Sequence, residues 1–306
     1  MTDDTLKSVI TCDMEGRIET FNAGAADIFG YTPEEIIGKK RVSLFSPGLV
    51  VLAHVNTWLS TAVKEGEYKG RTVFLRKDGS PLVADVRITP TFKNKEQIGY
   101  CGVSIPVPDV DPADAMPKIG LMTRIFAWLV VTRAPFLTAT IVPVLIGAAL
   151  AGLTGAIDWT TFAVVMTGAI ALHVAANTFN DYYDWKSGTD EANNDYFLPF
   201  SGGSRSLELG LITPAGLFKL SVAAMMVAVA TGVALYTWCG PELLYFGLFG
   251  AFSAYFYTAP PLRLVARKGL GELLIGLNFG PLMVGGTYFA LTGGVSNAAW
   301  LAGASI

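Results

Sequence analysis

Four amide and carboxylate side chains follow one another at helical spacing near the middle of the sequence. They stand at the end of a long apolar run and are Asn177, Asn180, Asp181 and Asp184. At ~100° per residue, all four fall on one face of a helix. Carboxylates in the last turn of a helix face the negative end of its dipole, so they require a compensating positive charge. The pattern therefore predicts a helix face that binds a cation.

The oxygen atoms on this face suit a hard cation. Mg²⁺ binds few protein ligands and keeps positions for water or phosphate, so a phosphorylated ligand would have room beside it. Gly188 is expected to break the helix, which leaves Asp190 in the following loop. A polar helix end solvated at the membrane interface is the alternative, but four such groups on one face at membrane depth favour a functional site.

A second set of residues could bind the anion that accompanies such a cation. Ser201-Gly202-Gly203-Ser204 offers backbone N–H groups, and Arg205 adds a planar charged donor that matches diphosphate oxygens. An ordinary turn with an arginine would explain the same residues, but beside a Mg²⁺-type face we favour a diphosphate site. Other residues are candidates for contacting the diphosphate, although the tendency of basic residues to stay on the cytoplasmic side would also account for most of them. These are Arg133, Tyr257, Arg263, Arg267 and Lys268.

The elements that must position these groups differ between the two halves of the chain. Of the 306 residues, 52% are hydrophobic and 15% are charged, but the charges crowd before about residue 120. The net charge of −3 gives no indication of nucleic-acid binding. Cys12, Cys101 and Cys239 lack the spacing of a metal or redox site, so buried thiols are expected. The sequence thus predicts a multidomain protein whose second half lies in a membrane.

Residues 1–107 are expected to form an α/β domain, and residues 108–120 form a linker rich in proline and aspartate. The motifs D-x-x-G-R-I from Asp13 and R-K-D-G-S from Arg76 resemble those of a PAS domain, over residues 7–106. The resemblance implies a sensory module for a small ligand, light or redox state, and a PAS-mediated homodimer is a further expectation. The ligand stays unknown, because no flavin-adduct cysteine motif occurs and a single histidine, His54, is a weak argument for haem.

Residues 121–306 are expected to form an all-α bundle that crosses the lipid bilayer. At ~1.5 Å per residue, ~20 apolar residues cross the ~30 Å hydrocarbon core. Lysine and arginine occur in alternate loops only, which places the acidic face and the N-terminal domain on the cytoplasmic side of the cell's inner membrane. Five spans and the start of a sixth are expected, at 135–153, 157–180, 214–238, 241–258 and 269–292, and from Asn297 onward.

This second half resembles the UbiA superfamily of intramembrane prenyltransferases. The motifs are N-D-Y-Y-D-W-K-S-G-T-D from Asn180, S-G-G-S-R up to Arg205, and Y-T-A-P-P-L-R-L from Tyr257. The first motif looks most like the branch that prenylates 1,4-dihydroxy-2-naphthoate on the way to menaquinone. The resemblance implies Mg²⁺-dependent transfer of a polyprenyl group from polyprenyl diphosphate to an aromatic acceptor. Dihydroxynaphthoate is the expected acceptor, while 4-hydroxybenzoate, a chlorophyllide and glycerophospholipid precursors stay open.

The resemblance also implies roles for single residues. Asn180, Asp184 and Asp190 would bind metal, with Asp181 as a neighbour that we include in the metal set, and Asp184 and Asn180 would be catalytic. The diphosphate would be contacted by Arg133, Arg205, Tyr257 and Arg263, and we add Asn177 and Lys268 as further candidates.

One departure from the family pattern bears on activity. UbiA-type enzymes use a second aspartate-rich motif, but no aspartate follows Asp195 here. We therefore expect these 306 residues alone to transfer little or nothing, as a fragment of a longer protein or as an inactive product. A non-catalytic PAS-coupled membrane sensor and a transporter that binds a coupling ion are the competing readings. In the leading reading, the PAS domain regulates the transferase.

Overall fold

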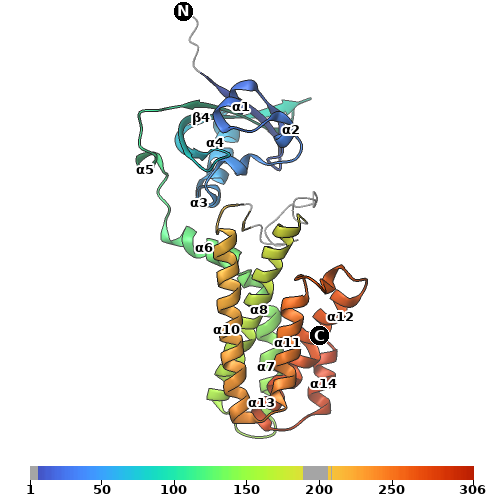
Figure 1. The fold of residues 1–306 in the computed structure, drawn as a ribbon. Coiled ribbons are helices and arrows are strands. Elements are labelled where there is room, and N and C mark those ends of the chain that lie inside the picture. Colours follow the sequence, from blue (N-terminus) through green and yellow to red (C-terminus); the bar gives the residue numbers. More distant parts are fainter. Residues whose placement is uncertain (1–5, 189–205, 208) are drawn as a thin grey trace, which may run out of the picture. The chain divides into compact units, whose positions relative to one another are not determined.

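The computed structural model describes residues 6–188, 206–207 and 209–306 and divides the chain into two compact units. The first unit comprises Met1–Trp128 and Glu208–Leu211, and the second comprises Leu129–Leu207 and Ile212–Ile306 (Figure 1). The expected order, an α/β domain followed by apolar helices, is confirmed.

The first unit contains one antiparallel sheet of five strands in the order β2-β1-β5-β4-β3. In β1 buried residues alternate with partly buried ones, because one face of the strand packs on the core and apolar side chains meet the helices there. Asp78-Gly79 forms the turn between β3 and β4. The bounds are β1 Ser8–Asp13, β2 Ile18–Phe21, β3 Tyr68–Leu75, β4 Pro81–Lys93 and β5 Glu96–Pro106.

Short helices connect β2 to β3 and cover one face of this sheet. Thr32 and Glu35 form a capping box at the start of one of them. The core joins the two layers through Ile18, Phe29 and Phe45. The helices are α1 Ala23–Phe29, α2 Pro33–Ile36, η1 Val42–Phe45, α3 Gly48–Val50, η2 Val51–Val55 and α4 Asn56–Glu65, and α5 Pro112–Ala115 follows the sheet.

The second unit is entirely helical in its described residues, and α8 is its central element. This helix contacts α7, α10, α11 and α13, which surround it (Figure 1). The elements are η3 Ala134–Leu137, α7 Thr138–Gly152, α8 Trp159–Ser187, α10 Pro214–Cys239, α11 Leu243–Phe256, η4 Leu264–Ala266, α12 Leu270–Leu277, η5 Asn278–Leu282, α13 Met283–Thr292 and α14 Asn297–Ala304, while α6 Leu121–Val131 precedes them across the unit boundary.

Within the described residues, four helical segments have the length and apolar composition needed to cross a membrane. They are Ala134–Gly152, Trp159–Ser187, Pro214–Cys239 and Leu270–Thr292. The segment expected at 241–258 forms α11, whose 14 residues rise only ~21 Å, less than the ~30 Å hydrocarbon core. Pro241 precedes the start of this helix, and Pro260 and Pro261 follow its end. The stretch expected to begin a sixth span forms α14.

A kink inside the segment Leu270–Thr292 shapes the interior of the bundle. Gly280 has non-helical backbone angles (φ −94°, ψ −105°) in η5, between α12 and α13. A Cβ atom at this position would lie 2.4 Å from the carbonyl oxygen of Gly303, so only glycine allows α14 to approach. The kink follows directly after Asn278 and Phe279, which line the cavity described below.

Candidate active site

The four polar residues predicted to share a helix face lie in the C-terminal part of α8. The helix begins at Asp158, whose carboxylate accepts a hydrogen bond from the Thr160 N–H at 3.0 Å. It ends at Gly188, where a left-handed backbone (φ +73°) lets the N–H bond back to the carbonyls of Asp184 and Trp185. The predicted break at Gly188 is confirmed, and the motif up to Asp184 is helical.

Arg133 and Asp181 form a hydrogen-bonded ion pair inside the bundle. Their side chains are 16% and 5% exposed, so the carboxylate of Asp181 is committed to the guanidinium at the start of η3. The sequence placed Asp181 in the metal set and Arg133 on the diphosphate. In the structure the two side chains contact each other, which holds Arg133 against α8.

A cavity of about 270 Å³ lies between α8, α11 and the kinked α12–α13 segment. Arg133, Asn177, Asn180 and Tyr257, four of the predicted site residues, line it. Its remaining walls are mostly apolar and include Ala169, Leu172, Ala176, Gly250, Ala254, Leu274, Ile275, Phe279 and Met283. The bundle therefore holds a space with polar groups from several elements and walls suited to hydrocarbon.

Three buried polar atoms of the cavity residues lack a hydrogen-bond partner within the part of the chain that the structure describes. They are Arg133 Nε, Asn177 Nδ2 and Ser253 Oγ. Leaving such groups unpaired is costly, and native proteins usually satisfy them with water or a ligand. The three atoms are thus buried polar groups beside the cavity that the described protein atoms leave unsatisfied.

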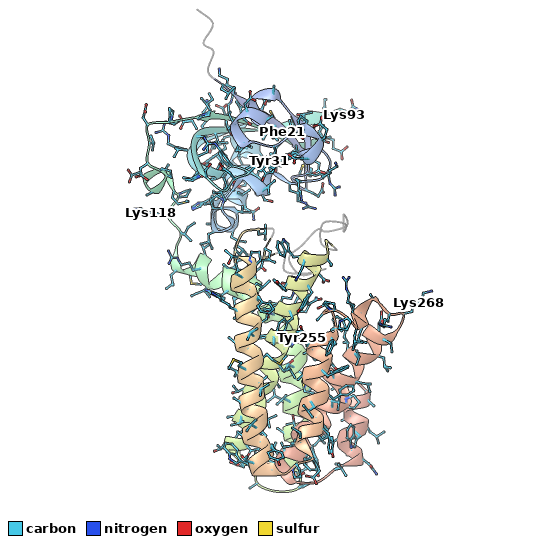
Figure 2. All side chains as sticks on the ribbon, viewed as in Figure 1. Phe21, Tyr31, Lys93, Lys118, Tyr255 and Lys268 are labelled. Carbon is cyan, nitrogen blue, oxygen red and sulfur yellow. The ribbon has the colours of Figure 1, made fainter. Side chains whose placement is uncertain are left out.

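Charged residues gather around the half-buried side chain of Asp184. The charges of Asp181, Arg133 and Arg263 act on its carboxylate, and Asp184 in turn acts on the hydroxyl of Tyr257. Arg263 is solvent-exposed and has a left-handed backbone (φ +42°) before η4. Lys268 lies on the same connection between α11 and α12, is exposed, and is not among the residues that line the cavity (Figure 2).

The acidic face fits an open magnesium site better than a closed protein cage. No three His, Cys, Asp or Glu side chains gather to hold a metal within residues 6–188, 206–207 and 209–306. Asn180 and Asp184 are one helical turn apart and offer two oxygen ligands, and Mg²⁺ completes its shell with water and phosphate. Asp190, Arg205 and the Ser201–Ser204 segment, which were assigned to the same site, lie outside the described residues.

Sequence reasoning missed three polar residues that line this cavity, His173, Ser253 and Asn278. The hydroxyl of Thr140 lies 2.6 Å from His173 Nδ1, and the imidazole packs against Phe279 with ring centres 5.0 Å apart. His173 precedes Asn177 by four residues, so helical spacing continues the polar face by one more turn. That spacing was the available signal, whereas nothing in the sequence marks Ser253.

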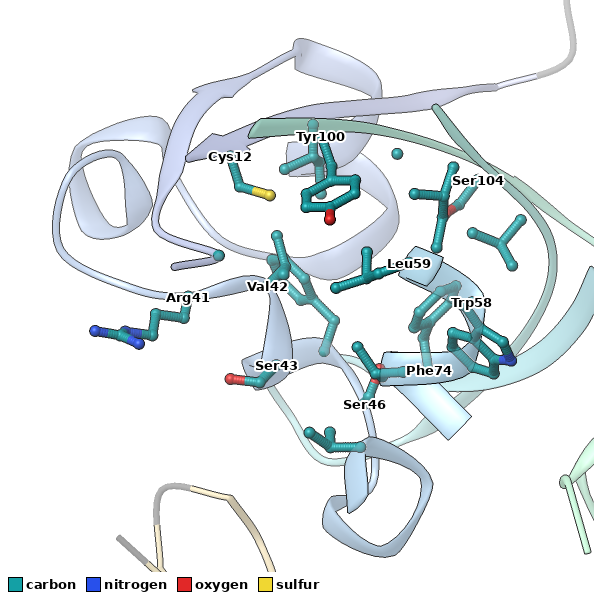
Figure 3. Close-up of a pocket in the computed structure, with 18 of the residues that line it drawn as sticks. Cys12, Arg41, Val42, Ser43, Ser46, Trp58, Leu59, Phe74, Tyr100 and Ser104 are labelled. Carbon is teal, nitrogen blue, oxygen red and sulfur yellow. The ribbon is translucent and has the colours of Figure 1, made fainter. Parts of the chain in front are cut away.

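The first unit has a separate cavity of about 240 Å³ between its sheet and the α3–α4 segment (Figure 3). Most of its lining is apolar, and Cys12, Tyr100 and Ser104 add polar atoms. Burial raises the pKa of the Cys12 thiol to about 11, so the thiol is protonated at neutral pH. His54 is not among the cavity residues; its Nε2 lies 3.3 Å from the carbonyl oxygen of Lys118.

Comparisons with known proteins match both halves of the chain. Residues 140–306 match the model of the UbiA prenyltransferase family, and residues 6–105 match a PAS domain model. The 1,4-dihydroxy-2-naphthoate octaprenyltransferase of Bacillus subtilis is 32% identical over 161 residues, which is 53% of this chain and 50% of that protein. The 2-carboxy-1,4-naphthoquinone phytyltransferase of Synechocystis is 30% identical over 166 residues, 53% of this chain and 50% of that protein.

The chain spans about half the length of these curated relatives. Among solved structures, a PAS domain from Colwellia psychrerythraea is 21% identical and covers 35% of this chain and 92% of its own, with a TM-score of 0.33.

Proposed function

Since this chain belongs to the UbiA prenyltransferase family, we propose that it transfers a polyprenyl group from a polyprenyl diphosphate to an aromatic acceptor with the help of Mg²⁺. The observation that carries the proposal is the cavity in which Arg133, Asn177, Asn180 and Tyr257 meet apolar walls. A prenyl diphosphate has the same division into a charged head and a hydrocarbon tail. The acceptor proposed is 1,4-dihydroxy-2-naphthoate, because two relatives at about 30% identity are named for naphthoate or naphthoquinone substrates.

In this proposal the charged residues bind the diphosphate head. Asn180 and Asp184, with Asp190, would hold Mg²⁺, which when bound supplies positive charge to the leaving diphosphate. Arg133 keeps its Nε–H free of partners in the described structure while Asp181 fixes its guanidinium, so this donor is oriented before the ligand arrives. Tyr257 and Arg263, with Arg205 and Lys268 as further candidates, would contact the diphosphate oxygens from the loops.

The apolar part of the cavity would protect the reacting carbon. When the bond to diphosphate breaks, the allylic group develops positive charge, and water would capture it. Leu172, Phe279 and Met283 line the cavity beyond the polar groups and exclude water from this region. The electron-rich ring of the acceptor then forms the new carbon–carbon bond and loses a proton or its carboxyl group.

The proposal keeps two expectations about the whole chain. The protein lies in the inner membrane, with the acidic end of α8 and the PAS domain on the cytoplasmic side. The PAS domain, as a dimer or alone, regulates transfer through a small ligand or redox signal. The apolar cavity of the first unit supports a small-molecule signal.

A comparison of two acceptors tests this function without requiring turnover. The chain in lipid nanodiscs is titrated with 1-hydroxy-2-naphthoate, the proposed acceptor without its 4-hydroxyl group, and with 4-hydroxybenzoate. Mg²⁺ and inorganic pyrophosphate are present in each titration. We expect tighter binding of the naphthoate, and binding of neither compound would overturn the proposed acceptor class. Rapid transfer by the purified 306-residue chain, given Mg²⁺ and both substrates, would contradict the expectation of low activity.

A further inference from the structure

His173 extends the polar stripe of α8 into the apolar part of the cavity. Residues 173, 177, 180 and 184 recur every three or four positions, so they share one helix face. At ~1.5 Å per residue, His173 lies ~6 Å along the axis from Asn177 and ~16 Å from Asp184. His173, Asn177 and Asn180 all line the same cavity. The imidazole is therefore too far from Asp184 to contact the metal or diphosphate bound there. It is close enough to Asn177 to contact a substrate that lies deeper in the same cavity.

The hydrogen bond to Thr140 fixes which imidazole nitrogen carries the proton. Thr140 is completely buried, and its hydroxyl has no hydrogen-bond partner other than His173 Nδ1 within the described part of the chain. If Nδ1 donated, the hydroxyl hydrogen would be buried without an acceptor, which is unfavourable. Thr140 therefore donates to Nδ1, and the proton of the neutral imidazole resides on Nε2.

The Nε2–H group is available to a ligand. His173 lines the cavity, and Nε2 is neither hydrogen-bonded to a described residue nor among the buried atoms that lack a partner, so it is accessible from the cavity. The edge of the imidazole meets the ring of Phe279 at an angle of 61°, which restricts rotation of the side chain. The contacts with Thr140 and Phe279 thus fix the direction of the Nε2–H group.

Around this donor the cavity has the features of a site for a flat aromatic compound with oxygen substituents. Ala169, Ala176 and Gly250 contribute little side-chain volume to the wall, and Phe279 offers an aromatic surface. Asn177 and Ser253 are further polar residues of its lining. We propose that His173, oriented by Thr140, donates a hydrogen bond from Nε2 to an oxygen of the aromatic acceptor and so positions its ring. The inference rests on the proposed function and makes His173 a positioning residue for the acceptor.

Binding of 1-hydroxy-2-naphthoate, followed by its own fluorescence, tests this role in nanodiscs with Mg²⁺ and pyrophosphate. We expect H173L to weaken binding about tenfold, as expected for loss of one hydrogen bond. T140V should weaken it similarly, because Nδ1 is then free to take the proton from Nε2. H173Q should bind nearly as tightly as wild type, since the glutamine amide donates from a similar position. His54 is the other histidine of the chain, and H54Q is the matched control with unchanged binding.

A second probe separates this inference from the proposed function. The affinity for Mg²⁺ with pyrophosphate should be unchanged in H173L, because the imidazole lies beyond the diphosphate groups. If wild type binds the naphthoate and H173L binds it equally well, the role of His173 is overturned and the proposed function stands. If wild type does not bind the naphthoate, the proposed acceptor fails and this inference fails with it. If H173L loses both ligands through misfolding, H173Q decides, and weak naphthoate binding by H173Q overturns the role.

Discussion

The guanidinium of Arg133 and the carboxylate of Asp181 form a buried ion pair that ties the start of η3 to the C-terminal part of α8. The pair neutralises one of the charges on the acidic face before any ligand binds. Arg133 also lines the cavity, and its buried Nε has no hydrogen-bond partner within the described structure. Arg133 can therefore bind the substrate while Asp181 holds its guanidinium in place.

Removing one member of this pair should destabilise the protein strongly. D181L or R133M leaves a buried charge without its partner, and we expect each to lower the free energy of unfolding by ~3–5 kcal/mol. The double variant R133M/D181L should lose less than either single variant, because no unpaired charge is left. Unfolding in detergent measures the cycle, and losses that simply add would show that the two side chains act independently.

Arg263 should matter more than Lys268 for binding of diphosphate. Both side chains are exposed and absent from the cavity lining, but the charge of Arg263 acts on the carboxylate of Asp184. We expect R263Q to weaken Mg²⁺-dependent binding of inorganic pyrophosphate at least about tenfold, the effect of losing a charged hydrogen bond. K268Q should weaken it by about fivefold at most, in line with exposed charge pairs. Calorimetry measures both affinities. A larger loss in K268Q than in R263Q would contradict this assignment and would place the diphosphate nearer Lys268.

The Cys12 thiol should react slowly with alkylating agents in the folded protein. Its pKa of about 11 is raised by burial, so the thiolate is lost as the pH falls below that value. At pH 8 only about one thousandth of the thiol is ionised. Mass spectrometry after iodoacetamide treatment should show a labelling rate that rises about tenfold per pH unit up to pH 10. Fast labelling at pH 7 would contradict the buried setting and would make Cys12 a candidate redox sensor.

Local signals in the sequence predicted much of what positions the site. Helical spacing placed Asn177 and Asn180 on one face, and Gly188 marked the end of α8. The contact between Arg133 and Asp181 could not be predicted, because it depends on how η3 packs against α8. The contact of His173 with Thr140 could not be predicted for a similar reason, since Thr140 comes from α7.

The length of the helix within 241–258 was the least predictable part of the membrane half. Apolar composition marks 241–258 as a span, but composition alone does not show where a helix begins and ends. The 14-residue length of α11 reflects the turn that precedes Leu243 and the prolines that follow Tyr257. The kink at Gly280 that shapes the cavity was likewise not predicted, because it depends on the close approach of α14.

The most direct test of the account is Mg²⁺-dependent binding of farnesyl thiodiphosphate, an analogue that resists cleavage, to the chain in nanodiscs. Wild type should bind it with Mg²⁺ and lose most of its affinity in EDTA. D184N should weaken binding with Mg²⁺ about tenfold, because a metal ligand loses its charge. D158N is the matched control at the opposite end of α8, where asparagine keeps the helix cap, and should bind like wild type. Equal binding by wild type and D184N, or binding unaffected by EDTA, would contradict the proposal that this helix face holds the metal and the diphosphate.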